Sequence, residues 1–172
     1  MDNDLENIFL ATFEANKERM FRICRSYATD ADDAKDLFQE VLLNLWKSLP
    51  SFKHESDINT WVYRVTINVC LRARQFSEKK ERHNIRLGSI HFENIADPAV
   101  QNDDELLYLK LSACIRKLEG TDQSIILLYL EDLPYKEIAA VFGLSENHVA
   151  VKIKRIKSNL FNCLKSYDYD RR

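Results

Sequence analysis

The feature of this sequence that most restricts its fold is the stretch from Leu133 to Leu164, LPYKEIAAVFGLSENHVAVKIKRIKSNLFNCL. Pro134 suits the first turn of a helix, because its missing N–H would have no partner there anyway. Gly143 permits the left-handed conformation that ends many helices, and Ser145 can cap a following helix. We therefore predict a helix from about Tyr135 to Phe142, a tight turn and a second helix, which is the order of a helix-turn-helix motif.

The second of these helices has two distinct faces. Apolar residues recur at steps of three and four and form one stripe: Val149, Ile153, Ile156, Leu160 and Leu164. Polar and basic side chains follow the same spacing about a quarter turn away. Together with the start of the helix they give a candidate DNA-binding set of Ser145, Asn147, His148, Lys152, Arg155 and Asn159. Lys and Arg suit phosphate oxygens and guanine, and Asn suits adenine, although a solvated basic face would show the same pattern.

Helical spacing of apolar residues also runs through most of the chain before this motif. Only three Gly and three Pro occur in 172 residues, and no alternating pattern typical of a strand stands out. Asp30 is well placed to cap one of the predicted helices. The sequence therefore predicts an all-α fold, with one long helix or two abutting helices over residues 5–27 and further helices over residues 31–49 and 58–82.

The helical spacing of apolar residues is absent from about His83 to Asp104, a run of mixed charge that contains Gly88 and Pro98. Such a stretch is typical of a linker. Helical spacing resumes at Leu106 and breaks again at Gly120. We therefore predict two small helical domains joined by a linker, with the domains at residues 1–84 and 105–172 and the linker at residues 85–104.

The helix predicted over residues 31–49 carries an acidic stripe. Opposite its apolar face lie Asp32, Asp33, Asp36, Glu40, Leu43 and Lys47. A row of carboxylates with a leucine in it suits docking on a basic partner. It fits equally well a solvated face with one exposed leucine, which is common on proteins.

The helix predicted over residues 58–82 gathers aromatic, basic and amide side chains near its start and along its outer face: Asn59, Thr60, Trp61, Tyr63, Arg64, Asn68, Arg72 and Arg74. Aromatic rings interleaved with Arg and Asn can stack on unpaired bases while holding their phosphates. Packing between helices is the alternative role for Trp61 and Tyr63.

Other features of the sequence exclude several classes of protein. The net charge of −2 is low for a protein that grips DNA unaided. The four cysteines lie far apart among apolar residues, so we predict buried, reduced thiols of a cytoplasmic protein and neither a metal site nor a disulfide. The chain has no N-terminal apolar run for a signal peptide or membrane span. It also has no phosphate loop and no catalytic motif, so neither an enzyme nor a cofactor is predicted.

Taken in order, these segments resemble a bacterial RNA polymerase sigma factor of the short, two-domain extracytoplasmic-function group. Three stretches carry the resemblance, which covers nearly the whole chain: DAKDLFQEVLLNLWKSLPSF, TWVYRVTINVCLRAR and YKEIAAVFGLSENHVAVKIKRIKSNL. The resemblance implies an initiation factor that binds core RNA polymerase, directs it to promoter DNA and helps open that DNA. It also implies an anti-sigma factor as a frequent further partner. A factor that borrows its affinity from polymerase would tolerate a negative net charge.

The resemblance further implies a role for each matching set of residues. Polymerase binding would fall to Asp32, Asp33, Asp36, Gln39, Glu40 and Leu43. The melted promoter element near the start site would be engaged by Lys53, His54, Asn59, Trp61, Arg64, Asn68 and Arg72. The upstream element would be read by the helix-turn-helix set, principally His148, Lys152 and Arg155, and the linker would thread toward the active-site and RNA-exit channels. The chain departs from the family pattern at residues 58–60 and at Ala150 and Val151, which leaves the promoter sequence open.

Two other classes of protein stay open at this point. A stand-alone helix-turn-helix regulator would dimerise or sense a signal through its N-terminal half and would bind DNA tightly without polymerase. An adaptor would use its helices to bind proteins alone and would support no initiation.

Overall fold

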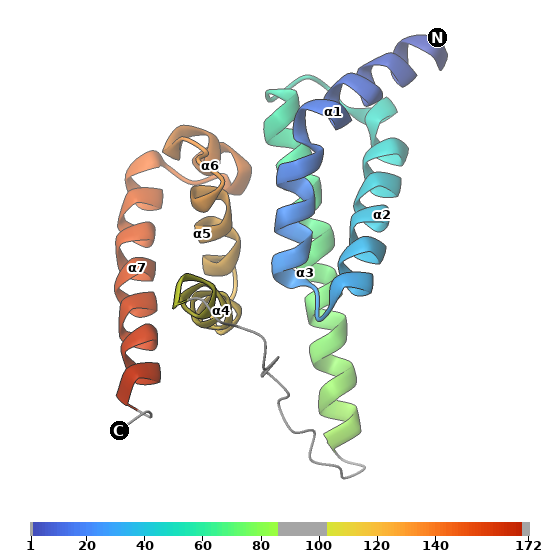
Figure 1. Ribbon diagram of the computed structural model, residues 1–172. Coiled ribbons are helices and arrows are strands. Elements are labelled where there is room, and N and C mark those ends of the chain that lie inside the picture. The colour runs from blue at the N-terminus through green and yellow to red at the C-terminus, as the bar shows by residue number, and fades with distance from the viewer. Residues whose placement is uncertain (1, 86–102, 170–172) are drawn as a thin grey trace.

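The structure, a computed structural model, describes residues 2–85 and 103–169, and every regular element in those two ranges is helical. Figure 1 shows two groups of helices side by side. The first group consists of α1 (Asp2–Tyr27), α2 (Ala31–Ser48), a 3₁₀ turn (Leu49–Ser51) and α3 (Ile58–Ile85); the second consists of α4 (Asp103–Arg116), α5 (Asp122–Leu130), α6 (Tyr135–Phe142) and α7 (Glu146–Tyr169). The all-α prediction with two small helical domains is confirmed. Most of the predicted linker, residues 86–102, lies outside the described ranges.

The ends of α2 follow from its capping residues. The carboxylate of Asp30 accepts hydrogen bonds from the backbone N–H groups of Asp32 and Asp33 at 3.0 and 2.8 Å. These are two of the N–H groups that have no partner within the helix, so the cap fixes where α2 begins. At the other end Pro50 cannot continue an α-helix, and the chain tightens into the 3₁₀ turn.

The helix-turn-helix motif forms where the sequence predicted it. α6 spans the predicted residues and ends at Gly143, whose φ of 66° is left-handed and whose N–H bonds to the carbonyl of Ala139. A Cβ at Gly143 would meet nothing within 4 Å, so glycine is favoured here by backbone conformation and not by space. The hydroxyl of Ser145 accepts a hydrogen bond from the backbone N–H of His148 at 3.2 Å, as expected of an N-cap.

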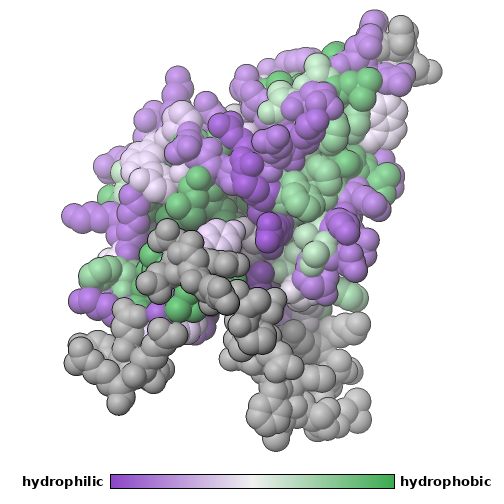
Figure 2. Space-filling view, viewed as in Figure 1, coloured by the Kyte–Doolittle hydropathy of each residue, from purple (hydrophilic) through white to green (hydrophobic). Residues whose placement is uncertain are grey.

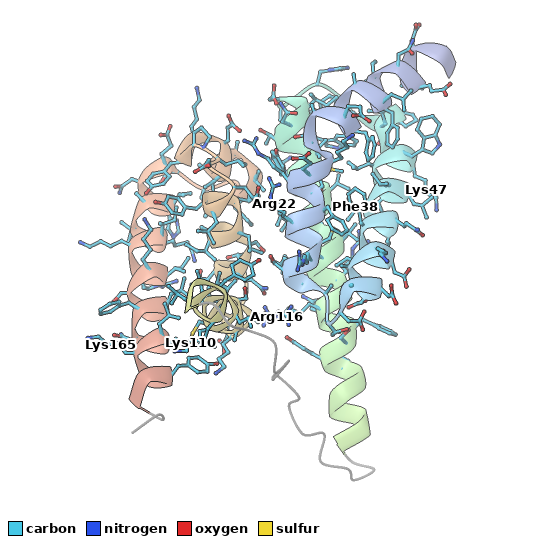
Figure 3. The ribbon with its side chains drawn as sticks, in the orientation of Figure 1. Arg22, Phe38, Lys47, Lys110, Arg116 and Lys165 are labelled. Atoms are coloured by element: carbon cyan, nitrogen blue, oxygen red, sulfur yellow. A yellow bond between two sulfur atoms is a disulfide. The ribbon has the colours of Figure 1, made fainter. Side chains whose placement is uncertain are left out.

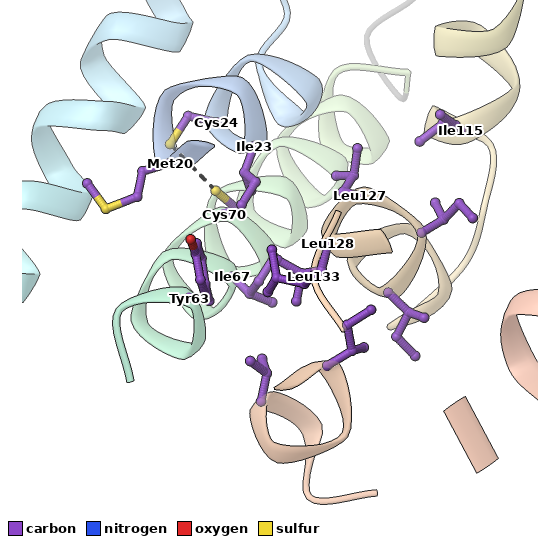
Figure 4. Close-up of a cluster of buried hydrophobic side chains, with 14 of the residues drawn as sticks. Met20, Ile23, Cys24, Tyr63, Ile67, Cys70, Ile115, Leu127, Leu128 and Leu133 are labelled. Atoms are coloured by element: carbon purple, nitrogen blue, oxygen red, sulfur yellow. Dashed lines mark hydrogen bonds between the residues drawn. The ribbon is translucent and has the colours of Figure 1, made fainter. Parts of the chain in front are cut away.

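Buried apolar side chains of both helical groups form one continuous cluster (Figure 4). α1 contributes Met20 and Ile23, α3 contributes Ile67, and the second group contributes Leu127 and Leu128 of α5. Each of these side chains is no more than 7% exposed. Because apolar burial is the main driving force for association, the two groups are held together by an apolar contact as well as by polar ones.

The prediction that all four cysteines are free is wrong for two of them. Cys114 on α4 and Cys163 on α7 form a disulfide, with their Cα atoms 6.0 Å apart. The two residues lie 49 positions apart in the sequence, so only the packing of α4 on α7 brings them together.

The prediction holds for Cys24 and Cys70, which are buried and free. The Cys70 thiol donates to the Cys24 sulfur across 4.0 Å, the contact drawn as a dashed line in Figure 4. This hydrogen bond, together with burial, raises the pKa of the Cys70 thiol. Cys70 is therefore protonated at neutral pH.

Candidate nucleic-acid and protein interfaces

The outer surface of α7 is the first candidate interface. Its predicted apolar stripe is buried, with Val149, Ile153 and Ile156 at most 1% exposed, except at Leu164, which is half-buried. Among the predicted DNA-binding side chains, that of Lys152 is largely covered. The other five are exposed: Ser145, Asn147, His148, Arg155 and Asn159. Burying one stripe turns the remainder of the helix outward, where its polar groups are accessible.

Two of the predicted DNA-binding side chains share one carboxylate. The ammonium of Lys152 lies 2.9 Å from one oxygen of Asp122, and the guanidinium of Arg155 lies 2.8 Å from the other. Burial acts to raise the pKa of Asp122, but the hydrogen bonds from Lys152 and Arg155 outweigh it and hold that pKa below its ordinary value. Asp122 is therefore ionised at neutral pH and is an acidic group beside a surface predicted to bind phosphate.

Sequence reasoning missed two outward-facing residues of α7. Val151 is 60% exposed, and Lys154 is exposed with no ion pair or hydrogen bond to any other described residue. At about 100° per residue Val151 lies opposite the buried stripe and Lys154 about 120° from its centre, whereas Lys152 lies nearer, on its flank. Measuring the helical angle of each residue from the centre of the apolar stripe would have identified both as outward-facing.

The start of α3 and the loop before it form the second candidate interface. The rings of His54, Phe52 and Trp61 follow one another, with centroids 4.6 and 5.0 Å apart. His54 holds a positive φ of 55°, which is uncommon for a residue other than glycine. Trp61 is half-buried, so part of its ring packs inward and part stays accessible.

The other predicted residues of this second interface have different surroundings. Lys53, Asn68 and Arg72 are exposed, and the Nε of Arg72 donates to the backbone carbonyl of Asn68 at 3.3 Å. The side chain of Asn59 is held by α1, since its oxygen accepts a hydrogen bond from the side-chain amide of Asn16 at 2.8 Å. Tyr63 is buried and bonds to Asn16 as well, so it has the packing role named as the alternative.

Arg64 reaches out of the first helical group to the end of α6. Its guanidinium donates to the backbone carbonyls of Ala140 at 2.7 Å and Val141 at 3.3 Å. The last turn of a helix carries partial negative charge, which favours a cation there. In this arrangement two of the five N–H donors of Arg64 are engaged by the helix-turn-helix unit.

Further polar contacts surround the apolar contact between the two groups. Arg22 on α1 points toward the second group (Figure 3) and forms a two-pronged ion pair with Glu131, with a shortest distance of 2.7 Å. The hydroxyls of Tyr27 and Ser124 lie 2.6 Å apart. Arg74 of α3 also bonds to the side chain of Gln123. Both candidate DNA interfaces are thus fixed relative to each other by side chains from α1 and α3.

The exposed face of α2 is the third candidate interface. All six predicted polymerase-binding residues are exposed: Asp32, Asp33, Asp36, Gln39, Glu40 and Leu43. Asp33 also has a local task, because its carboxylate accepts hydrogen bonds from the backbone N–H and the hydroxyl of Thr29. Leu43 is 57% exposed and Trp46, which the sequence reasoning left out, is 46% exposed. Figure 2 shows hydrophobic side chains scattered among hydrophilic ones on the face in view.

The described parts of the chain contain neither a metal-binding cluster nor a membrane-spanning helix. No group of three or more His, Cys, Asp or Glu residues there is arranged to hold a metal ion. No helix in those parts has the length and apolar character needed to cross a bilayer.

Comparison with known protein families gives two matches. The model of Sigma-70 region 2 matches residues 12–79, and the model of Sigma-70, region 4 matches residues 108–160. The first therefore covers most of α1, α2 and α3, and the second covers the helix-turn-helix and the two helices before it.

Individual relatives are similar over most of the chain. "ECF RNA polymerase sigma factor SigG" of Mycobacterium tuberculosis is 27% identical over 152 residues, which are 86% of this chain and 39% of SigG. The chain thus spans about two fifths of that relative's length. "RNA polymerase sigma factor SigV" of Bacillus subtilis is 24% identical over 141 residues, 81% of each chain.

Two solved structures have the same fold. CnrH, solved in complex with the cytosolic domain of CnrY, superposes with a TM-score of 0.67 and 18% identity, covering 94% of this chain and 90% of CnrH. The Bartonella quintana sigma factor RpoE, solved with the anti-sigma factor NepR, gives a TM-score of 0.62 and 18% identity, covering 94% and 97%. The arrangement of helices in two groups is therefore shared with both.

Proposed function

The chain belongs to the extracytoplasmic-function group of the bacterial sigma-70 family, and from this premise we propose that it is a cytoplasmic initiation factor without enzymatic activity. It binds core RNA polymerase, directs it to specific promoters and helps open the promoter DNA. The observation that carries this proposal is the occurrence of regions 2 and 4 in one chain and in that order.

Polymerase docks on the exposed face of α2 in this proposal. Asp36 and Glu40 lie one helical turn apart and are solvated, so they are available to a basic partner. Leu43 and Trp46 supply apolar surface beside them, and burial of such side chains is what makes a charged contact tight.

Promoter opening uses the aromatic cluster Phe52–His54–Trp61 and the exposed face of α3 behind it. A flipped base stacks on the accessible part of Trp61, and Asn68 and Arg72 contact the backbone of the same unpaired DNA strand. Two donors of Arg64 are bonded to the carbonyls of α6 here, and Arg64 brings its whole guanidinium to the DNA only when it leaves them. The two helical groups must therefore separate at this contact before the whole face engages DNA.

The upstream promoter element lies against α7. The N-terminus of α7 approaches a phosphate of the DNA, because free N–H groups there favour an anion. It brings with it the side chains of Ser145, Asn147 and His148. Arg155 reaches base edges from the middle of the helix, and Lys154 adds a cation that is not paired with any described residue. This division follows the usual one, in which phosphate contacts position a helix and base contacts specify the sequence.

The proposed domain bounds are residues 1–84 and 105–172, with the linker at 85–104. They are supported by the gap between the two matched regions, which end at residue 79 and begin again at residue 108. An anti-sigma factor is a further proposed partner, supported by the structural relative RpoE, which was solved with the anti-sigma factor NepR.

Reconstitution with core polymerase tests the proposal. The chain should co-purify with core enzyme and should confer transcription from a promoter that core enzyme alone does not use. Binding to DNA without polymerase, and no co-purification with it, would identify a stand-alone regulator. Co-purification without any initiation would identify an adaptor.

A further inference from the structure

Asp122 is held from two sides by cations of α7. It is the first residue of α5, where the positive end of the helix dipole favours a carboxylate. Each of its two oxygens accepts a hydrogen bond from a different cation of α7, Lys152 at 2.9 Å and Arg155 at 2.8 Å. Only 17% of its side chain is exposed. Neither the family resemblance nor the predicted site includes this residue.

The two cations are affected differently by this shared carboxylate. The side chain of Lys152 is 19% exposed and its ammonium faces Asp122, so its charge is largely neutralised before DNA arrives. The side chain of Arg155 is 59% exposed and gives only one terminal nitrogen to Asp122. A guanidinium has five N–H donors in a rigid fork, so the rest of the fork remains free and is held in one orientation.

We propose that Asp122 is a positioning residue that determines the sequence specificity of the upstream contact. It fixes the guanidinium of Arg155 for base recognition and, by neutralising Lys152, reduces attraction to phosphate that carries no sequence information. The inference rests on the proposed function. It differs from a purely structural tie between α5 and α7, which would change all DNA affinities equally.

Removing the charge of Asp122 should change how DNA binding depends on salt. Each phosphate neutralised by a protein cation adds about −0.9 to the slope of log affinity against log salt. Asp122→Asn keeps the size of the side chain and removes its charge, so Lys152 becomes available to one phosphate. We expect tighter binding to DNA of any sequence, and a salt slope steeper by about one unit.

Releasing Arg155 from Asp122 should also change how well the protein discriminates between bases. A bidentate arginine–guanine pair discriminates against a wrong base by about 5- to 150-fold. When Arg155 is released from Asp122, we expect discrimination at one base pair to fall several-fold, toward the value found with Arg155→Ala. Discrimination at the other base pairs should stay as it is in the unsubstituted protein.

The experiment uses holoenzyme reconstituted from core polymerase and the full chain. The probes are duplexes selected from a random pool by the unsubstituted holoenzyme, their single-base variants, and a scrambled duplex of equal length. Asp122→Asn should steepen the salt slope and lose discrimination, and Asp122→Asn with Lys152→Met should return the slope to its original value. Lys154→Met is the matched control: it removes a cation from the same helix and should flatten the slope by about one unit.

Three outcomes separate the possibilities. If Asp122→Asn weakens selected and scrambled duplexes equally, with no change of slope, Asp122 is only a structural tie and the inference is overturned. If Asp122→Asn fails to fold, Asp122→Glu keeps the charge while moving it outward, and it should keep the slope but lose discrimination; unchanged discrimination would overturn the inference. If the unsubstituted holoenzyme selects no sequence at all, the proposed function fails instead.

Discussion

Loss of the Cys114–Cys163 bridge should destabilise the second helical group by up to about 4 kcal/mol. The bridge joins residues 49 positions apart, with Cys114 buried at 1% exposure. Closing a loop of that length removes roughly 14 cal/mol/K of entropy from the unfolded chain, which is about 4 kcal/mol at 25 °C. The double substitution Cys114→Ser and Cys163→Ser, or reduction of the unsubstituted protein, removes this constraint.

Urea unfolding followed by circular dichroism measures the effect, with and without dithiothreitol. We expect reductant to lower the midpoint of the unsubstituted protein and to leave that of the double variant unchanged. Cys24→Ser is the control, because it alters a buried thiol outside the bridge and should keep the response to reductant. Titration in denaturant should find two free thiols per chain before reduction and four after it. Four free thiols in unreduced protein, or a midpoint indifferent to reductant, would refute the reasoning.

Two further predictions concern the other candidate interfaces. Asp36→Lys with Glu40→Lys should weaken binding to core polymerase by like-charge repulsion. The unfolding midpoint should stay nearly unchanged, because both side chains are exposed. Leu43→Ala should weaken the same binding through lost apolar contact. The measurement is competition for core enzyme, and a double variant that competes as well as the unsubstituted chain would place the interface elsewhere. Trp61→Ala should make the free energy of open-complex formation less favourable by about 1–3 kcal/mol per stacked base. A premelted template should restore much of the loss. Equal loss on duplex and premelted templates would assign Trp61 to packing against Phe52.

The helix-turn-helix and the cap of α2 could be predicted from the sequence because their signals are local. Pro134, Gly143 and Ser145 each act on backbone groups within a few residues of themselves. The structure places two of them as expected, with Gly143 left-handed and Ser145 bonded to the following turn, whereas Pro134 precedes α6 as its N-cap with an extended ψ of 148°.

The contacts of Arg64 and Asp122 could not be predicted in this way. Arg64 is bonded to carbonyls 76 and 77 residues away, and Asp122 to cations 30 and 33 residues away. Both contacts depend on how helices pack, and no spacing rule within one helix reports that. The disulfide was missed for the same reason, whereas the exposure of Val151 follows from helical phase alone.

The sigma-factor account is tested most directly by a salt titration of promoter binding by the free chain and by the holoenzyme. In the free chain Arg64 is bonded to α6, Lys152 and Arg155 share Asp122, and the net charge is −2. We therefore predict that the free chain binds duplex DNA at physiological salt only with the weakness of non-specific complexes, with Kd of roughly 10⁻⁴–10⁻⁶ M. Core polymerase should bring the selected promoter to the specific range of roughly 10⁻⁸ M or tighter. Tight, sequence-specific binding by the free chain at physiological salt would contradict the account and identify a stand-alone regulator.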